Sequence, residues 1–250
     1  MLRFIYGKPA LLFGKTLAIA DLHIGFEREL AAKGIRLGPM RDVLLRDMAT
    51  LLDETKAERL AIVGDVKHTI AGAGFSEWLE LKAMLRELCG MAKVVIVPGN
   101  HDGDILRVAG DAEIAPGSGI RMGKVALCHG HAWPDEKMMG AEELLVGHIH
   151  PRVEVRDELG GRCTERAWLI AKADVKALEA RYPKANAKLR LVAMPAFNQL
   201  VGGMPLNRPG SDRLMGPLLR GGMFKLGTGE IYLLNGVGLG RLSALRQAKA

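Results

Sequence analysis

Five short apolar segments in the first 150 residues each end directly at a polar cluster that contains a histidine. They cover residues 16–20, 60–63, 94–97, 125–128 and 144–146. Nearly continuous apolar runs of this length are typical of strands buried on both faces. Because ligands gather outside the carboxyl ends of the strands in open α/β sheets, we expect the five following loops to meet along one edge.

The residues between and after these strands predict the other elements. Apolar residues at helical spacing indicate helices over 41–56 and 76–88, the second with Ser76 as its N-cap. A hairpin is predicted from 152–156 and 163–171 through Gly160 and Gly161, then a helix over 173–182 and a strand over 189–193. Residues 223–226 and 230–234 predict a second hairpin, and a last strand follows Gly238. The Gly- and Pro-rich residues 194–222 predict a long loop over the surface. Alternating strands and helices indicate an α/β fold.

Composition limits the class of protein. A chain of 250 residues, 48% of them hydrophobic, can bury a large core, and without a repeat or clear boundary we expect one domain over 1–250. The three cysteines form no Cys-x-x-Cys pair, which argues against a disulfide framework and predicts a reducing compartment. No apolar run approaches the roughly 20 residues that span a bilayer, so we expect a cytoplasmic protein with no membrane partner.

The formal net charge of +7 is unevenly spread. Residues 181–250, a basic and Gly/Pro-rich C-terminal part, contain eleven Lys or Arg against Asp212 and Glu230. This pattern indicates nucleic acid or another acidic macromolecule as a partner, although a well-solvated basic face explains the charge equally well.

All seven histidines lie in the five polar clusters, beside Asp, Asn or Gly. The clusters are Asp21-Leu22-His23, Gly64-Asp65-Val66-Lys67-His68, Gly99-Asn100-His101-Asp102, His129-Gly130-His131 and Gly147-His148-Ile149-His150. Imidazole is the commonest side-chain metal ligand, and the carboxylates beside it favour a metal centre over structural histidines. Single clusters of this kind occur by chance, but five in order at strand ends do not.

Seven side chains are the candidate metal ligands: Asp21, His23, Asp65, Asn100, His129, His148 and His150. Two divalent ions about 3.5–4 Å apart need a shared ligand, and Asp65 is the candidate bridge. Asp21 and His23 stand at i and i+2, so they point to the same side of an extended strand end. Mixed nitrogen and oxygen ligands disfavour calcium, and we expect two manganese ions first, with iron, zinc or nickel as alternatives.

Such paired ions activate water and stabilise the oxygens of an in-line displacement, which predicts phosphate ester hydrolysis. His101 is the candidate general acid for the leaving alkoxide, because it faces the opposite side from Asn100. Asp102 or His68 is expected to orient or tune His101, with His68 holding the ester as the alternative. Two roles are open for His131: it is either a metal ligand itself or the partner of a metal ligand.

The ordered blocks Asp21-x-His23, Gly64-Asp65, Gly99-Asn100-His101-Asp102, His129 and Gly147-His148-x-His150 resemble those of the calcineurin-like metallophosphoesterase superfamily. The resemblance implies a four-layer αββα sandwich of two mixed sheets flanked by helices. It implies one metal held by Asp21, His23, Asp65 and His150, and a second held by Asp65, Asn100, His129 and His148. It also implies that His101 is the catalytic acid.

Within the superfamily, the position of His68 after Gly64-Asp65 is similar to that in SbcD-type DNA repair nucleases, where the matching histidine assists catalysis. The short length and residues 194–197 and 202–203 are closer to small SbcD-related archaeal phosphoesterases and to the bacterial phosphoesterase that accompanies a DNA ligase and helicase. This resemblance implies DNA repair and a helicase or ligase partner. The chain lacks the length for the capping domain with which larger repair nucleases grip DNA, which disfavours DNA-end processing. It also lacks the arginine that follows the second block in protein phosphatases, which disfavours activity on phosphoproteins.

Three functions agree with these residues. The first is a nuclease-like phosphodiesterase acting on nucleic acid or a nucleotide diester, with Arg208, Arg213 and Arg220 as preferred nucleic-acid contacts, unless they serve only solubility. The second is a small-molecule phosphatase or cyclic-nucleotide phosphodiesterase, because one metal centre serves many esters. The third is a non-catalytic scaffold that binds a partner protein, which the complete ligand set disfavours.

Overall fold

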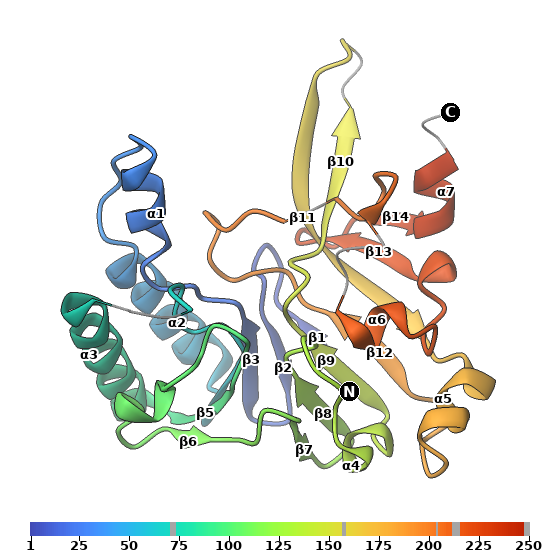
Figure 1. Cartoon of the computed structure of the whole chain (residues 1–250), viewed down its shortest axis with the longest axis horizontal. Coiled ribbons are helices and arrows are strands. Elements are labelled where there is room, and N and C mark those ends of the chain that lie inside the picture. The colour runs from blue at the N-terminus through green and yellow to red at the C-terminus, as the bar shows by residue number, and fades with distance from the viewer. Residues whose placement is uncertain (71–73, 157–158, 204, 212–215, 248–250) are drawn as a thin grey trace.

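The computed structural model describes residues 1–70, 74–156, 159–203, 205–211 and 216–247, and it contains two β-sheets with helices outside each (Figure 1). The first sheet has the order β1 (Arg3–Phe4), β2 (Leu11–Phe13), β3 (Thr16–Ala20), β4 (Arg59–Val63), β5 (Lys93–Val97) and β6 (Glu113–Ile114). From β3 to β6 the strands are parallel, whereas β1 and β2 add antiparallel pairs at one edge. Parallel neighbours need crossovers, and α2 (Arg41–Thr55) and α3 (Phe75–Met91) lie in two of them.

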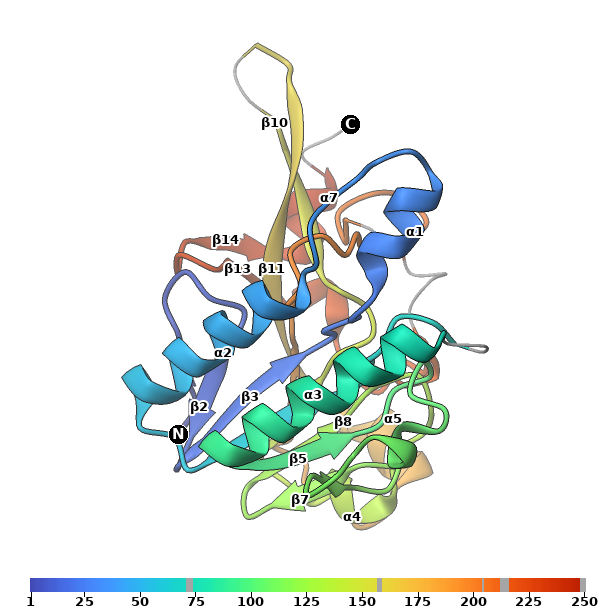
Figure 2. The ribbon, with the colours of Figure 1, turned by 90° about the vertical axis from the view of Figure 1, so that its left-hand side faces the viewer.

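The second sheet is also mixed. Its order is β14 (Gly238–Arg241), β13 (Glu230–Leu233), β11 (Arg162–Lys172), β12 (Arg190–Ala193), β9 (Glu143–Val146), β8 (Val125–Cys128) and β7 (Ile120–Met122). The strands β8, β9 and β12 are parallel. A further strand, β10 (Arg152–Arg156), pairs with the outer half of β11, and this hairpin projects from the body of the molecule in two views (Figures 1 and 2).

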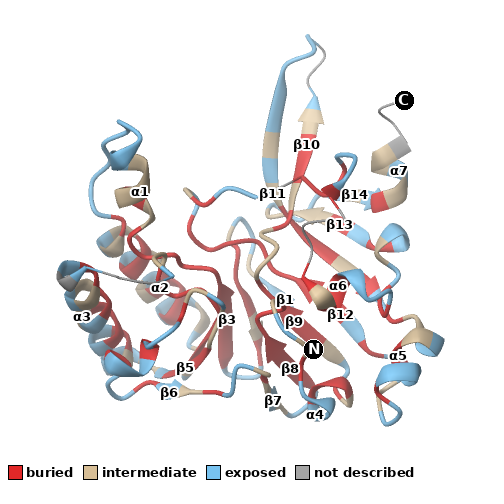
Figure 3. Cartoon of the chain, viewed as in Figure 1, coloured by how far each residue is buried: buried red, intermediate tan, exposed pale blue. Residues whose placement is uncertain are grey.

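Three buried hydrophobic clusters separate four layers, and buried residues follow the facing sides of helices and sheets (Figure 3). In β3, Leu17 and Ile19 pack against α2 and α3, whereas Ala18 and Ala20 face the second sheet. This alternation follows from the two-residue period of a strand, and it makes β3 apolar on both faces. The other side of the second sheet packs against α4 (Glu136–Met139), α5 (Val175–Arg181), α6 (Pro217–Arg220) and α7 (Leu242–Gln247). The predicted αββα sandwich is confirmed.

The five apolar segments that precede the polar clusters form β3, β4, β5, β8 and β9, so their prediction as buried strands is confirmed. The β10–β11 hairpin, the helix α5, the strand β12 and the last strand β14 are also confirmed, with shifts of one or two residues at their ends. The helix α1 (Phe26–Ala32), the strands β1 and β2, and the helices α6 and α7 were not predicted.

Two local predictions are wrong. Ser76 is not an N-cap, because α3 begins at Phe75 after Gly74, and the Ser76 hydroxyl accepts a hydrogen bond from Arg28 instead. Residues 223–226 do not pair with 230–234. Because β11 is long enough to pair with β13 along Trp168 and Leu169, β13 lies between β11 and β14, and residues 226–228 form a 3₁₀ turn.

The prediction of a surface loop over 194–222 is wrong for much of its described part. Met194, Phe197 and Asn198 are buried, as are Leu218 and Leu219 of α6. The backbone amide of Phe197 donates to Ala20 at 2.7 Å, so this segment packs against the end of β3. Among the residues that the structure describes, no helix is long and apolar enough to cross a membrane.

Candidate metal centre

Loops from both sheets are hydrogen-bonded to one another at the carboxyl ends of β3, β4, β5, β8 and β9. The backbone amide of His23 donates to the carbonyl oxygen of Asp65 at 2.8 Å. The Asp65 carboxylate accepts from the amide of His101 at 2.9 Å, and the Asp21 carboxylate accepts from the amide of His148 at 3.2 Å. The first sheet therefore binds the second sheet through the polar clusters, as the expectation of one shared edge required.

Backbone strain is concentrated in the same clusters. Within the described part of the chain, seven non-glycine residues have positive φ, and five of them are Asp21, His23, Asp65, His148 and His150. Left-handed backbone conformations are unfavourable for residues that carry a Cβ, and they cluster at functional sites where the surroundings enforce them. These strained residues are the same ones whose side chains form the groups that could hold a metal.

The first group of potential ligands consists of Asp21, His23 and His150, whose candidate ligand atoms lie within 4.8 Å of one another. The Nε2 atoms of His23 and His150 face each other at 3.3 Å, and the Nε2 atom of His150 lies 3.5 Å from Oδ1 of Asp21. Two neutral imidazole nitrogens facing each other need a proton or a cation between them, so this group has the donor set of a metal site.

The second group consists of Asp65, His129 and His148, again within 4.8 Å. The Nε2 atom of His129 is buried without a hydrogen-bond partner, although it lies 3.2 Å from Oδ2 of Asp65. A buried nitrogen that points at a carboxylate without a good hydrogen bond fits a ligand to a cation. Oδ2 of Asp65 is also 3.6 Å from Nε2 of His23, so Asp65 lies between the two groups, where a bridging ligand is needed.

The predicted catalytic residues surround these groups. His101 Nδ1 donates to the backbone carbonyl of His68, and its Nε2 atom lies 3.9 Å from Oδ2 of Asp65. The buried Asp102 carboxylate accepts from the backbone amides of Val66 and Gly99, both at 2.8 Å. Asp102 therefore joins the β4 and β5 loops, rather than orienting the His101 ring, and it is the His68 carbonyl that binds that ring.

A family model for calcineurin-like phosphoesterases matches residues 14–183. The chain belongs to this family. Because the family model covers most of the chain and the Asp and His side chains come together in groups that could hold a metal, the protein is a metallophosphoesterase. No curated protein sequence matches the chain.

Solved structures that are similar to this phosphoesterase include a nuclease and a phosphoesterase. The nuclease MPE of Pseudomonas putida is 21% identical, with a TM-score of 0.59, and the alignment covers 94% of this chain and 98% of that one. The phosphoesterase Yfce of E. coli is 14% identical, with a TM-score of 0.42, over 90% of this chain and 97% of that one. The likeness to the Pseudomonas protein confirms the fold of two mixed sheets with flanking helices.

The electrostatics of this phosphoesterase fit a pair of divalent cations. Burial disfavours the charged form of Asp21, but the attraction of His150 and His129 outweighs it and lowers the pKa of Asp21. Burial lowers the pKa of His23 to about 3 and that of His148 to about 4, so both imidazoles are neutral at neutral pH. For His129 and His150 burial acts the same way, but nearby carboxylates outweigh it and raise both pKa values. A histidine binds a metal in its neutral form, so a bound cation would compete with protonation of these two rings.

Asn100 and His131 are less closely tied to the two groups. Asn100 is exposed on the β5 loop, beside His101, and its role as a ligand stays a prediction. The ring of His131 lies 5.2 Å from that of His129, and its buried Nδ1 atom has no hydrogen-bond partner. Burial lowers the pKa of His131, so it is a neutral neighbour of the second group, and both of its predicted roles stay open.

The sequence predictions missed residues that position the ligands. The carbonyl oxygen of Gly202 accepts from Nδ1 of His150 at 3.0 Å, and the side chain of Asn198 donates to the backbone of Leu22 at 2.9 Å. On α1, the carboxylate of Glu29 binds Nε2 of His68 at 2.7 Å. A backbone acceptor carries no side-chain signature, and the burial of Asn198 gave no signal either, because its segment was predicted to be a surface loop.

The predicted nucleic-acid contacts are only partly described. Arg208 donates to the buried carboxylate of Glu154 at 2.6 Å, which neutralises much of its charge. Arg213 lies outside the described residues. Arg220 is exposed at the end of α6. All three roles stay predictions, with Arg220 better placed than Arg208 to meet a phosphate.

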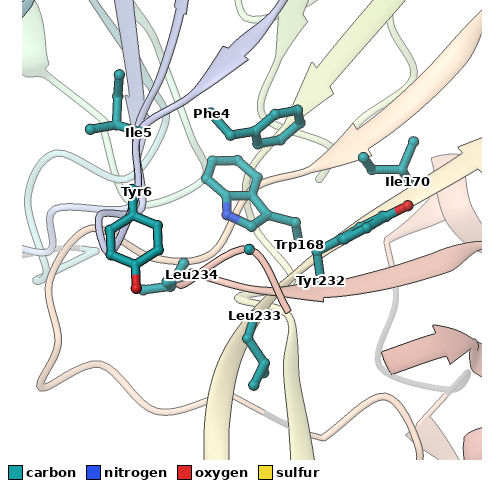
Figure 4. A pocket seen from close by; sticks show the side chains of 9 residues that line it. Phe4, Ile5, Tyr6, Trp168, Ile170, Tyr232, Leu233 and Leu234 are labelled. Atoms are coloured by element: carbon teal, nitrogen blue, oxygen red, sulfur yellow. The ribbon is translucent and has the colours of Figure 1, made fainter. Parts of the chain in front are cut away.

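A prominent apolar pocket lies elsewhere. Figure 4 shows this cavity of about 360 Å³, lined by aromatic and aliphatic side chains that include Trp168 and Tyr232, with none of the predicted ligands among them. A phosphate ester is an anion and needs polar partners, so this pocket is not where hydrolysis occurs. An open hollow of about 580 Å³ lies beside the metal groups, and Arg28, Glu29, His68 and His101 are among the residues that border it.

Proposed function

We propose that this metallophosphoesterase is a phosphodiesterase of the nuclease type, acting on nucleic acid or a nucleotide diester. The position of His101 carries the proposal. Its Nδ1 atom is bound to the carbonyl of His68, so its Nε2 atom is left to face the metal groups, at the border of the open hollow beside them. A diester releases an alkoxide that needs a proton, and a histidine fixed at this edge can supply it.

Two divalent ions are expected in the two groups, manganese first, with the ligand assignments that the resemblance implies. When bound, such ions supply an activated water and stabilise the charge that develops on the phosphoryl oxygens. The chain supplies the rest: Asp65 holds the two groups together, the carbonyl of Gly202 orients His150, and His101 delivers the proton.

The projecting β10–β11 hairpin favours a polyanionic substrate over a small one. Arg156 and Arg162 are directly opposite each other in its register, and both are exposed. Like charges directly opposite each other destabilise an antiparallel pair, and bound phosphates would offset that repulsion. Because β10 begins two residues after His150, the hairpin leads from the metal centre to these arginines. The fold shared with a protein described as a nuclease agrees with this substrate class.

The first test replaces His101 by alanine. We expect kcat for bis(p-nitrophenyl) phosphate with manganese to fall about 10²–10⁴-fold, the usual contribution of a general acid. His101 belongs to neither of the two groups around Asp65, although its candidate ligand atom also lies within 4.8 Å of those of His23 and His68, so two manganese ions should still bind to the variant. Steady-state kinetics and metal analysis of the same samples check both points. Full activity in the variant would remove His101 from the mechanism.

The second test concerns nucleic acid. In the double variant Arg156→Ser/Arg162→Ser, the slope of log affinity against log salt should decrease by about 1.4–1.8, as expected for two lost phosphate contacts. Filter binding of single- and double-stranded DNA across a salt series measures it. Arg190→Ser is the control for the loss of an exposed arginine, because Arg190 pairs with Glu143 away from the hairpin, as Arg156 pairs with Glu154 within it, with Nε of Arg156 3.8 Å from Oε1 of Glu154. Hydrolysis of bis(p-nitrophenyl) phosphate should not change. An unaltered slope would exclude the hairpin and leave Arg208, Arg213 and Arg220 as the contacts to test.

The closer kinship to SbcD-related phosphoesterases, a role in DNA repair, a helicase or ligase partner and a single domain over residues 1–250 stay predictions. A panel of DNA, RNA, cyclic nucleotides and monoesters would separate the proposed diesterase from a small-molecule phosphatase. Hydrolysis confined to monoesters would refute the proposal.

A further inference from the structure

A row of three side chains leads from the surface of α1 to the first group of ligands. Oε2 of Glu29 lies 2.7 Å from Nε2 of His68, and Nδ1 of His68 lies 3.4 Å from Nδ1 of His23. The other nitrogen of His23, Nε2, faces His150 and Asp65. Each ring therefore uses one nitrogen toward the surface and the other toward the metal groups.

These contacts determine where the ring protons lie. A carboxylate only accepts hydrogen bonds, so Nε2 of His68 carries the proton that binds Glu29. With a single ring proton on His68, its Nδ1 atom accepts and Nδ1 of His23 donates across the 3.4 Å contact. With its proton on Nδ1, His23 has its lone pair on Nε2, the atom that faces Asp65. That is the tautomer that a metal ligand needs.

We propose that Glu29 and His68 are positioning residues that fix the tautomer and ring orientation of His23 for one of the two metal ions. The proposal rests on the metal centre of the proposed function. It replaces the direct catalytic role expected for the His68 side chain, while the backbone carbonyl of His68 still holds His101. A single residue thus orients a ligand through its ring and the general acid through its backbone.

The helix α1 is built to place this carboxylate. Phe26, at the start of α1, packs its ring edge-on against His68, with ring centroids 4.9 Å apart. Glu29 follows three residues later, on the same helical face. Arg28, between them, donates to Glu80 of α3 at 2.6 Å and so ties α1 to the body of the protein. The second oxygen of Glu29 pairs with Lys33, which offers a way to disturb the carboxylate without touching His68.

The test is calorimetric titration of the metal-free protein with manganese chloride. In Glu29→Ala, one of the two manganese affinities should fall about 10–100-fold, the usual effect of losing a partner of a ligand. Glu29→Gln should restore most of the affinity, because the amide oxygen accepts the same hydrogen bond. Lys33→Ala is the matched control and should leave both affinities unchanged. Glu29 is on the surface, so thermal unfolding without metal should hardly change.

Nitrogen NMR of ¹⁵N-histidine-labelled, metal-free protein gives a second readout. The wild type should show His23 protonated at Nδ1, and Glu29→Ala should show a mixture of tautomers. Unchanged affinities and tautomers in Glu29→Ala, or an equal loss in Lys33→Ala, would overturn the proposal. Wild-type protein that binds two manganese ions but cleaves no diester would refute the proposed function and leave this proposal standing.

Discussion

Replacement of Asp65 by asparagine is expected to abolish binding of the metal pair and, with it, diester hydrolysis. Oδ2 of Asp65 lies 3.2 Å from Nε2 of His129 and 3.6 Å from Nε2 of His23, so one carboxylate serves both groups. Asparagine keeps the shape and one oxygen but replaces the other carboxylate oxygen with an NH₂ group, which only donates and cannot ligate a cation. The variant should therefore fold, yet lack the shared ligand and its negative charge.

Thermal unfolding with and without manganese measures the loss. At about 100 times its dissociation constant, a ligand stabilises the folded state by about 2.7 kcal/mol. For a chain of this size, that shift corresponds to a rise in Tm of about 5–11 °C. The wild type should show this rise and Asp65→Asn should not. Metal analysis after dialysis should give two manganese ions for the wild type, and retention of both in the variant would contradict the bridging role.

Asp102→Asn is the contrasting control, because Asp102 is also a buried aspartate in the same loops. Burial raises the pKa of Asp102, and its oxygens accept hydrogen bonds from the backbone amides of Val66 and Gly99. An asparagine there turns one acceptor into a donor that faces an amide, which costs about 1–3 kcal/mol of stability. Asp102→Asn should thus unfold at a lower temperature but keep both metals.

The sequence predicted the strands and candidate ligands because both have strong local signals. In β3, β4 and β5 the apolar residues are continuous, since one face packs on helices and the other on the second sheet. The histidine clusters follow strand ends, so their convergence needed no knowledge of the loops. The division of these strands between two sheets was different: it came from the family resemblance, because burial on both faces does not say what covers each face.

Elements whose role depends on distant partners could not be predicted. Glu29 is one of two acidic residues on a short helix, and only the position of α1 brings it to His68. Gly202 acts through its carbonyl oxygen, which every residue type carries. The Gly- and Pro-rich composition of residues 194–222 indicated an irregular path but not its burial against β3. Residues 223–226 have strand-like composition, but their predicted partner, β13, pairs with the long strand β11 instead.

Replacement of Gly64, a glycine of the polar clusters, by alanine is expected to lower both the stability of the protein and its metal binding. Gly64 has φ of +79°, and a Cβ at this position would lie 1.8 Å from Nδ1 of His129. The left-handed backbone costs about 1–2 kcal/mol for a residue with a Cβ. The collision forces either His129 or the β4 loop to move, and overpacking of this kind costs about 1–3 kcal/mol. We expect the variant to lose about 2–5 kcal/mol of stability and its second group of ligands.

Alanine variants at two further glycines distinguish the effect of backbone strain from that of steric collision. Gly14 has φ of +52° with nothing within 4 Å of its Cβ position, so Gly14→Ala should lose only the conformational part and bind manganese normally. Gly99 lacks the positive φ, but its Cβ would lie 2.1 Å from Oδ1 of Asp65, so Gly99→Ala should lose metal through collision alone. Chemical unfolding and manganese titration of the three variants give both quantities. If Gly14→Ala lost as much manganese affinity as Gly64→Ala, close packing of glycines against the ligands would not be what positions them.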